Sequence, residues 1–236
     1  RTFTVGLNAT FKKNTIMKLT KLHSILILSA GLTLQSCLDI DPKDQLSETN
    51  YWRNTEQFTL FASQFYGWTH NFKDIIGDGF HSDLRSDLLM TSTLSAYSNG
   101  TNTVPAEDTN YRDTYNRIRQ VNFLLKNAQI YSSPADIKVP VAEAKFFRAY
   151  LFFDLVQIYG DAIIVKEPLD IDSPELQRAQ NPRGEVIDFV IQDLKDAIKD
   201  LPPYKSITGA DAGRVSAEAA EAFLSRVALY EGTWQK

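Results

Sequence analysis

Residues 141–160 read V-A-E-A-K-F-F-R-A-Y-L-F-F-D-L-V-Q-I-Y-G and are the most informative part of the sequence about its architecture. Aliphatic or aromatic side chains lie on nearly every side of a helix drawn through it, and Gly160 ends the pattern. A helix that is apolar nearly all round is buried between neighbours rather than placed on a surface. The stretch therefore predicts the central helix of an all-α protein.

Helical patterns continue after and before this stretch. Residues 111–131 and 182–201 both keep the helical period. Asn181 is expected to be the N-cap of the second of these helices, with Pro182 at its first helical position. A further helix is expected to start at the cap residue Ser216. The residues predicted for its inner face are Ala219, Ala220, Phe223, Val227 and Tyr230.

An earlier helix and a long irregular segment precede these elements. Asn54 and Gln57 have the spacing of a capping box, and apolar residues at helical spacing follow them. Residues 74–110 carry glycine, proline and many small polar residues, and no helical stripe persists there. Long loops of this kind are usually functional or disordered.

The four later helices form two candidate antiparallel pairs, 111–131 with 141–160 and 182–201 with the helix from residue 216. Small residues at helix crossings, with aromatic rings between them, favour a tetratricopeptide-like stack. Two pairs are fewer than the three or so repeats that such a stack needs. We therefore expect an all-α fold of tetratricopeptide-like antiparallel helical pairs with long irregular loops, truncated before the rest of the fold.

The N-terminal part has the pattern of a bacterial lipoprotein signal. Lysines follow Met17, an apolar run covers residues 22–34, and Ser36 precedes Cys37. We interpret residues 1–16 as upstream translation, 17–36 as the signal peptide, 37–49 as a polar tether and 50–236 as the helical domain. Cys37 is then the lipidated residue. A lone cysteine is otherwise a small buried hydrophobe, and an apolar run of this length is otherwise a buried helix.

Composition narrows the ligand classes. Residues 1–36 hold five of the 25 Lys and Arg and none of the 29 Asp and Glu, so residues 37–236 carry a net charge near −9. This balance argues against nucleic acid, whose phosphates need clustered cations, and it is compatible with a neutral ligand. A single cysteine allows no disulfide within the chain and no site built on several thiolates.

Several blocks resemble one family in the family's own order. They are residues 37–42 with Tyr51 and Trp52, residues 115–122, residues 141–160, residues 181–202 and residues 213–232. Together they resemble the SusD/RagB family of nutrient-binding outer-membrane lipoproteins of Bacteroidetes. The resemblance implies tetratricopeptide-like helical pairs and a longer whole protein on the outer face of the outer membrane. It also implies binding of glycans or other nutrients, a TonB-dependent (SusC-like) transporter as partner, and no enzymatic activity or cofactor.

Catalytic and metal-binding patterns are weak. Asp78, His81, Asp83 and Asp87 match no standard metal loop, so we interpret them as solvated loop residues. Glu143 and Asp154 lie on one predicted helix without an evident acid–base partner, which favours a surface or packing role. His70 has no catalytic neighbour in the sequence, and no nucleophile elbow or zinc-binding motif occurs.

The segment 91–110 is the preferred candidate for ligand contact. Neutral sugars are held by aromatic faces and by amide or hydroxyl side chains. Tyr97, Asn99 and Asn102 supply these types, and Trp68 and Tyr111 flank the segment. The resemblance implies that the corresponding region contributes to the ligand site, often through a tryptophan, which this segment lacks. The alternative is an ordinary polar turn at Asn99 and Gly100.

Three functions follow in order of preference. The first is a surface-exposed nutrient-binding lipoprotein, with an oligo- or polysaccharide as ligand. The second is a helical-repeat adaptor of the cell envelope that binds another protein. The third is a glycoside hydrolase, which would need two carboxylates about 5–10 Å apart.

Overall fold

The computed structural model describes residues 51–70 and 96–232, all within one compact unit that spans residues 48–236. The main helices are α2 (Thr55–Ser63), α3 (Thr109–Ile130), α4 (Lys138–Tyr159), α5 (Arg183–Asp200) and α6 (Ala217–Glu231). Short 3-10 helices are η1 (Gln64–Trp68), η4 (Pro134–Ile137), η5 (Pro174–Gln177), η6 (Tyr204–Ser206) and η7 (Gly209–Asp211). The described residues contain no β-strand. The predictions for residues 1–49, Cys37 included, and for Asp78, His81, Asp83 and Asp87 fall outside the described residues.

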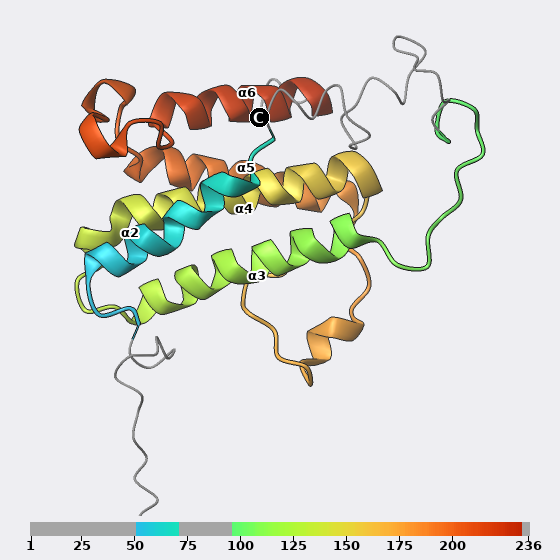
Figure 1. The fold of residues 1–236 in the computed structure, drawn as a ribbon, viewed down its shortest axis with the longest axis horizontal. Helices are drawn as coiled ribbons and strands as arrows, with labels where there is room; N and C mark the ends of the chain where they lie inside the picture. The colour runs from blue at the N-terminus through green and yellow to red at the C-terminus, as the bar shows by residue number, and fades with distance from the viewer. Residues whose placement is uncertain (1–50, 71–95, 233–236) are drawn as a thin grey trace, which may run out of the picture. The chain divides into compact units, whose positions relative to one another are not determined.

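Helix α4 lies at the centre of the bundle. Helices α3 and α5 pack on it, α6 packs on α5, and α2 lies against α3 and α4 (Figure 1). Helices α3 to α6 alternate in direction, so consecutive helices are antiparallel. The predicted all-α fold of antiparallel helical pairs is therefore confirmed, and α2 is an additional helix on the first pair.

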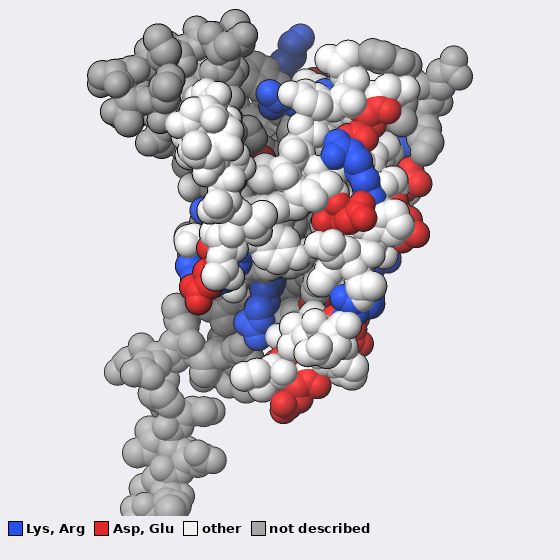
Figure 2. All heavy atoms as spheres, turned by 90° about the vertical axis from the view of Figure 1, so that its right-hand side faces the viewer, with Lys and Arg blue, Asp and Glu red and all other residues white. Residues whose placement is uncertain are grey.

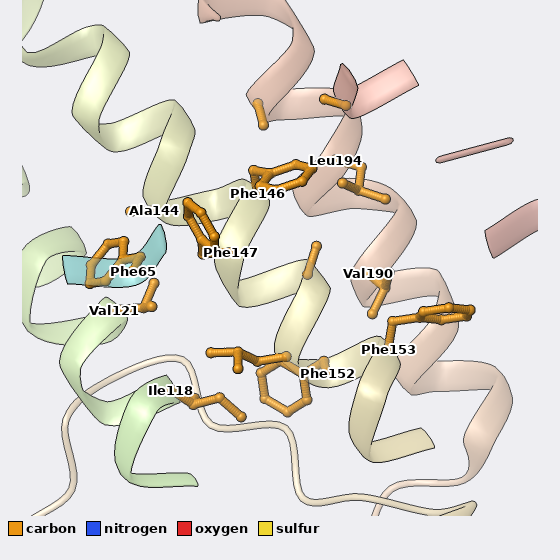
Figure 3. Close-up of a cluster of buried hydrophobic side chains, with 14 of the residues drawn as sticks. Phe65, Ile118, Val121, Ala144, Phe146, Phe147, Phe152, Phe153, Val190 and Leu194 are labelled. Atoms are coloured by element: carbon orange, nitrogen blue, oxygen red, sulfur yellow. The ribbon is translucent and has the colours of Figure 1, made fainter. Parts of the chain in front are cut away.

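The aromatic side chains of α4 fill the space between the helices (Figure 3). Phe147 is fully buried and meets Phe65 of η1 at 5.8 Å between ring centroids. On another side of α4, Phe152 meets Phe189 of α5 edge-on at 5.3 Å. Burial of one such ring stabilises the fold by about 1.5–3 kcal/mol. Helix α4 is thus buried on several sides, as its sequence predicts.

The helix starts follow the predicted caps with one exception. The capping box is present, with the Asn54 side chain accepting from the backbone N–H of Gln57, and the Ser216 side chain accepts from that of Ala219. The prediction for Asn181 is wrong, because α5 starts at Arg183 with Pro182 as its N-cap. The side chain of Asn181 instead accepts from the N–H of Ile164 and donates to the carboxylate of Glu185 in the first turn of α5.

The segment at residues 162–165 is an extended crossing rather than a strand. It makes one antiparallel bridge, between Ala162 and Asn181. Its other hydrogen bonds go to side chains, including the hydroxyl of Tyr115 and the amide of Asn181. The segment is thereby attached to α3 and to the start of α5.

The outermost helix, α6, buries less than its pattern predicts. Ala220 and Val227 are fully buried, and Phe223 is half-buried. Ala219 is exposed, so its predicted inward position is wrong. Tyr230 is 62% exposed, but its ring meets that of Phe153 on α4 at 5.9 Å between centroids. The buried stripe of α6 is narrower than predicted because α6 is the outermost helix, packed on α5 and meeting α4 through Phe223 and Tyr230.

Two groups of buried charged side chains connect the helices. Arg148 of α4 forms two hydrogen bonds with the carboxylate of Asp193 on α5, at 2.7 and 2.8 Å, and donates to Asn122 of α3 at 3.0 Å. Glu143 of α4 is fully buried and accepts hydrogen bonds from Arg214 and from the Tyr66 hydroxyl. The packing role predicted for Glu143 therefore agrees with its position.

Candidate functional site

Residues 96–102 form a compact turn in the segment that leads into α3 (Figure 1). The backbone carbonyl of Ala96 accepts from the N–H groups of Thr101 and Asn102, at 2.9 and 3.1 Å. Gly100 has a φ of 71°, a left-handed conformation that glycine adopts without a steric cost. The turn at Asn99 and Gly100, which the sequence offered as the alternative to a ligand contact, is thus present and has a defined shape.

The three candidate residues of this turn have different roles in it. The side-chain oxygen Oδ1 of Asn99 accepts hydrogen bonds from the backbone N–H and from the hydroxyl of Thr101, at 3.0 and 2.6 Å. Asn99 therefore stabilises the turn, and its amide N–H groups remain as donors. Tyr97 is 46% exposed, and Asn102 is exposed. The turn presents a ring and amide groups at the surface.

Tyr111 lies at the base of this segment, in a cluster of three tyrosines. Its ring centroid is 4.8 Å from that of Tyr115 and 5.1 Å from that of Tyr159. The Tyr159 hydroxyl donates to the carboxylate of Asp108, the N-cap of α3, at 2.8 Å. Burial raises the pKa of Tyr159 to about 12 and also raises the pKa of Tyr115. The cluster thus fixes the first turn of α3 against the end of α4.

Trp68 lies at the end of η1 and is half-buried. Its ring centroid is 4.9 Å from that of Phe65, and the guanidinium of Arg117 lies 5.9 Å from it. Arg117 lies six residues beyond Tyr111 on α3, about 9 Å along the helix axis, so Trp68 and Tyr111 pack against different neighbours. Tyr97, Asn99 and Asn102, in contrast, share one turn.

The carboxylates considered for catalysis have structural partners. Both oxygens of the fully buried Glu143 accept from Arg214. Asp154 lies 3.2 Å from the ring nitrogen Nε2 of His70, a pairing between residues 84 positions apart that the sequence did not reveal. In the described part of the chain, His, Cys, Asp and Glu form no group of three that would hold a metal ion.

None of the described helices has the length and apolarity needed to cross a membrane.

A groove of about 720 Å³ lies between the segment 164–178 and α5. Its lining includes Glu185, Asp188 and Gln192 from one face of α5 and Lys166 and Arg178 from the opposing segment. No pattern in the sequence pointed to this groove. The spacing of 185, 188 and 192 marks one helix face, but only the path of the segment 164–178 shows that this face borders a groove.

Comparison with known proteins identifies the family. Residues 38–229 match the SusD-like family described as starch-binding and associating with the outer membrane. A SusD-like protein of Formosa agariphila is 22% identical over 192 residues, which cover 77% of this chain and 37% of that protein. A SusD-like protein of Bacteroides ovatus is 30% identical over 95 residues, 40% of this chain and 16% of that protein.

Solved structures of the same family share the fold. A SusD-like carbohydrate-binding protein from Bacteroides fragilis superposes with a TM-score of 0.62 at 20% identity, covering 78% of this chain and 39% of that one. A laminarin-binding SusD-like protein has a TM-score of 0.59 at 25% identity, with 78% and 41% covered. The chain thus spans about two fifths of these relatives' length. It belongs to the SusD-like family, a family of carbohydrate-binding proteins associated with the outer membrane.

Proposed function

We propose that this chain is part of a cell-surface glycan-binding lipoprotein that delivers its ligand to a TonB-dependent outer-membrane transporter of the SusC type. The observation that carries the proposal is the family match over residues 38–229, which includes every helix from α2 to α5 and nearly all of α6. The matched family is described as starch-binding, and one structural relative is described as laminarin-binding. A polysaccharide or oligosaccharide is therefore the proposed ligand class.

The surface charge supports a neutral ligand. Figure 2 shows one face of the molecule, on which acidic and basic side chains are interspersed and uncharged surface lies between them. A polyanion such as nucleic acid would need a continuous basic surface. A neutral glycan is instead held by aromatic rings and by side chains that exchange hydrogen bonds with its hydroxyl groups.

Within the described residues, the turn at 96–102 is the proposed contact for this ligand. Tyr97 offers a partly exposed ring, and Asn102 offers an exposed amide two residues after Gly100. The turn is held by its own hydrogen bonds, so little conformational entropy would be lost when a ligand binds. Tyr111 and Trp68, both half-buried in the bundle, stay in the proposal as further candidates for ligand contact.

Binding rather than catalysis is the proposed activity. Glu143 and Asp154, the two carboxylates of α4, are engaged by Arg214 and His70. A glycosidase needs one carboxyl group in its protonated form and a second one placed across the bond to be cleaved. The buried ion pair of Glu143 serves the packing of α4 instead.

The anchoring part of the proposal concerns Cys37. A thiol acylated at this position would hold the helical domain at the membrane through the tether at 37–49. In whole cells, we expect Cys37→Ala to release the full-length protein from the membrane fraction and to abolish labelling by a radioactive fatty acid. Unchanged membrane attachment of this variant would contradict the lipoprotein assignment.

The binding and partner parts are tested with the full-length protein. We expect it to be retarded in native gels that contain a neutral polysaccharide such as laminarin, starch or xylan. We also expect it to co-purify with a TonB-dependent transporter from solubilised outer membranes. Capture of an envelope protein with no retardation by any polysaccharide would favour the adaptor function instead.

A further inference from the structure

The groove between the segment 164–178 and α5 has a wall that is fixed from inside the core. The carbonyl of Val165 accepts from the side-chain amide of Asn122 at 2.9 Å. Asn122 is fully buried and in turn accepts from Arg148. A chain of hydrogen bonds thus leads from the buried pair of Arg148 and Asp193 to the backbone of the groove wall.

Other backbone groups at the start of the wall also have partners. The N–H of Ile164 donates to the side-chain carbonyl of Asn181 at 3.1 Å, and the guanidinium of Arg178 donates to the carbonyl of Ile164. The hydroxyl of Tyr115 accepts from the N–H of Ile163 at 2.8 Å and donates to its carbonyl at 3.1 Å. The extended residues 162–165, which make one antiparallel bridge, are therefore held in one position, and this preorganises the start of the groove wall for a ligand.

The floor of the groove includes one aromatic ring. Phe189 is half-buried, and Phe152 of the core meets it edge-on at an angle of 90°. The ammonium group of Lys166 lies 5.5 Å from the Phe189 ring centroid, and the guanidinium of Arg148 lies 5.0 Å from it. An apolar surface and a hydrogen-bond donor are thus adjacent in the groove.

The side chains that line the groove are mostly polar and carry both signs of charge. The lining contains two cations, Lys166 and Arg178, and four carboxylates, Glu167, Glu175, Glu185 and Asp188. The net charge of −2 disfavours an anionic ligand. Carboxylates accept hydrogen bonds from hydroxyl groups, and amides and cations donate to them, so the lining suits a ligand rich in hydroxyl groups.

We propose that this groove is a second binding site for a neutral oligosaccharide, separate from the turn at 96–102, a proposal that rests on the glycan-binding function above. The groove volume of about 720 Å³ is within the range of small-molecule sites. Glu175 from one wall and Gln192 from the other contact the sugar hydroxyl groups. Phe189 provides the apolar surface for the C–H face of a ring.

The test uses the full-length protein with Tyr97→Ala, which weakens the first site, and calorimetric titration with laminarihexaose, maltohexaose and xylohexaose. We expect Glu175→Ala combined with Gln192→Ala to weaken the remaining binding about tenfold, since two hydrogen bonds are lost. The matched control combines Gln177→Ala and Glu221→Ala, exposed residues outside the groove lining, and should leave the affinity unchanged.

Hydrogen exchange provides a second measurement that does not depend on the variants. The hexasaccharide that binds should slow amide exchange in residues 162–178 and 183–192. Equal affinity of the groove variant and the control, with no such protection, would overturn the second site and leave the proposed function in place. Absence of binding by the unsubstituted protein to all three hexasaccharides and to the polysaccharide gels would overturn both.

Discussion

Helix α4 with its neighbours and the turn at 96–102 contain the same kinds of side chain but use them differently. In the core, the ring of Phe147 and the amide of Asn122 are both fully buried. The ring packs on Phe65, and the amide accepts a hydrogen bond from Arg148. In the turn, Tyr97 is 46% exposed and Asn102 is exposed. Aromatic and amide side chains therefore stabilise the fold in the core, whereas in the turn at 96–102 they are exposed to a ligand. Changes in the core should reduce stability, and changes in the turn should reduce binding.

The largest loss of stability is expected for Asp193→Asn. This change leaves the guanidinium of Arg148 buried without its charged partner, which costs about 3–5 kcal/mol for a buried pair. Urea unfolding followed by circular dichroism measures the loss. The control is Asp196→Asn on the same helix, whose partly exposed ion pairs with Lys145 of α4 and with Lys199 are each worth no more than about 1 kcal/mol. Similar losses for the two variants would contradict the role given to the buried pair.

A smaller loss is expected for Asn122→Ala. The side chain of Asn122 joins Arg148 to the carbonyl of Val165, so its removal leaves two buried groups with one partner fewer. The expected cost is about 1–3 kcal/mol in the free energy of unfolding. Asn127→Ala serves as the control, because Asn127 bonds only to the carbonyl of Phe123 within its own helix. Faster amide exchange in residues 162–166 of the Asn122 variant would show that the groove wall has loosened.

Alkaline pH should destabilise the core through its tyrosines. Burial raises the pKa of Tyr159 to about 12, from an ordinary value of 10.0, and raises the pKa of Tyr66 and Tyr115 in the same direction. The unfolded chain therefore loses these protons at lower pH than the folded one. The stabilisation is complete below pH 10.0 and is lost as pH rises toward 12. Urea midpoints measured across this range should fall, and constant midpoints would contradict the burial of these phenols.

Much of the helical scaffold was predictable from sequence because its cause is local. The apolar pattern of residues 141–160, the capping box at Asn54 and the cap at Ser216 act within one helix, and the structure contains all three. The Asn181 cap was mispredicted because its side chain binds Ile164, which is 17 residues away. The preference of asparagine for the N-cap position depends on neighbouring residues and does not include so distant a contact.

The candidate site was less predictable because it depends on how distant segments meet. Tyr97 and Tyr111 are both tyrosines near the same segment, and nothing in the sequence distinguishes the exposed ring from the one packed on Tyr115 and Tyr159. The groove beside α5 was missed for the same reason. Its walls come from one helix face and from a segment whose position is set by Asn122 and Tyr115 of another helix.

The smallest effect on stability is expected for Tyr97→Ala. Its ring is 46% exposed and lies in a turn held by backbone hydrogen bonds, so the free energy of unfolding should change by less than it does in Tyr111→Ala. Tyr111→Ala should cost more, about 1–3 kcal/mol, because it removes two ring contacts at the start of α3. Thermal unfolding of the two variants, side by side, measures this difference. Equal losses would mean that the turn and the tyrosine cluster do not differ as described.

The affinity of the full-length protein for laminarin, starch and xylan tests whether it binds a neutral glycan through the turn at 96–102. Calorimetry would compare Tyr97→Ala with Tyr204→Ala, a tyrosine that is 72% exposed at η6. We predict that one of these polysaccharides binds, that Tyr97→Ala weakens binding about tenfold through the loss of one stacking ring, and that Tyr204→Ala leaves it unchanged. Equal affinities of the two variants, or no binding by the unsubstituted protein, would contradict the claim.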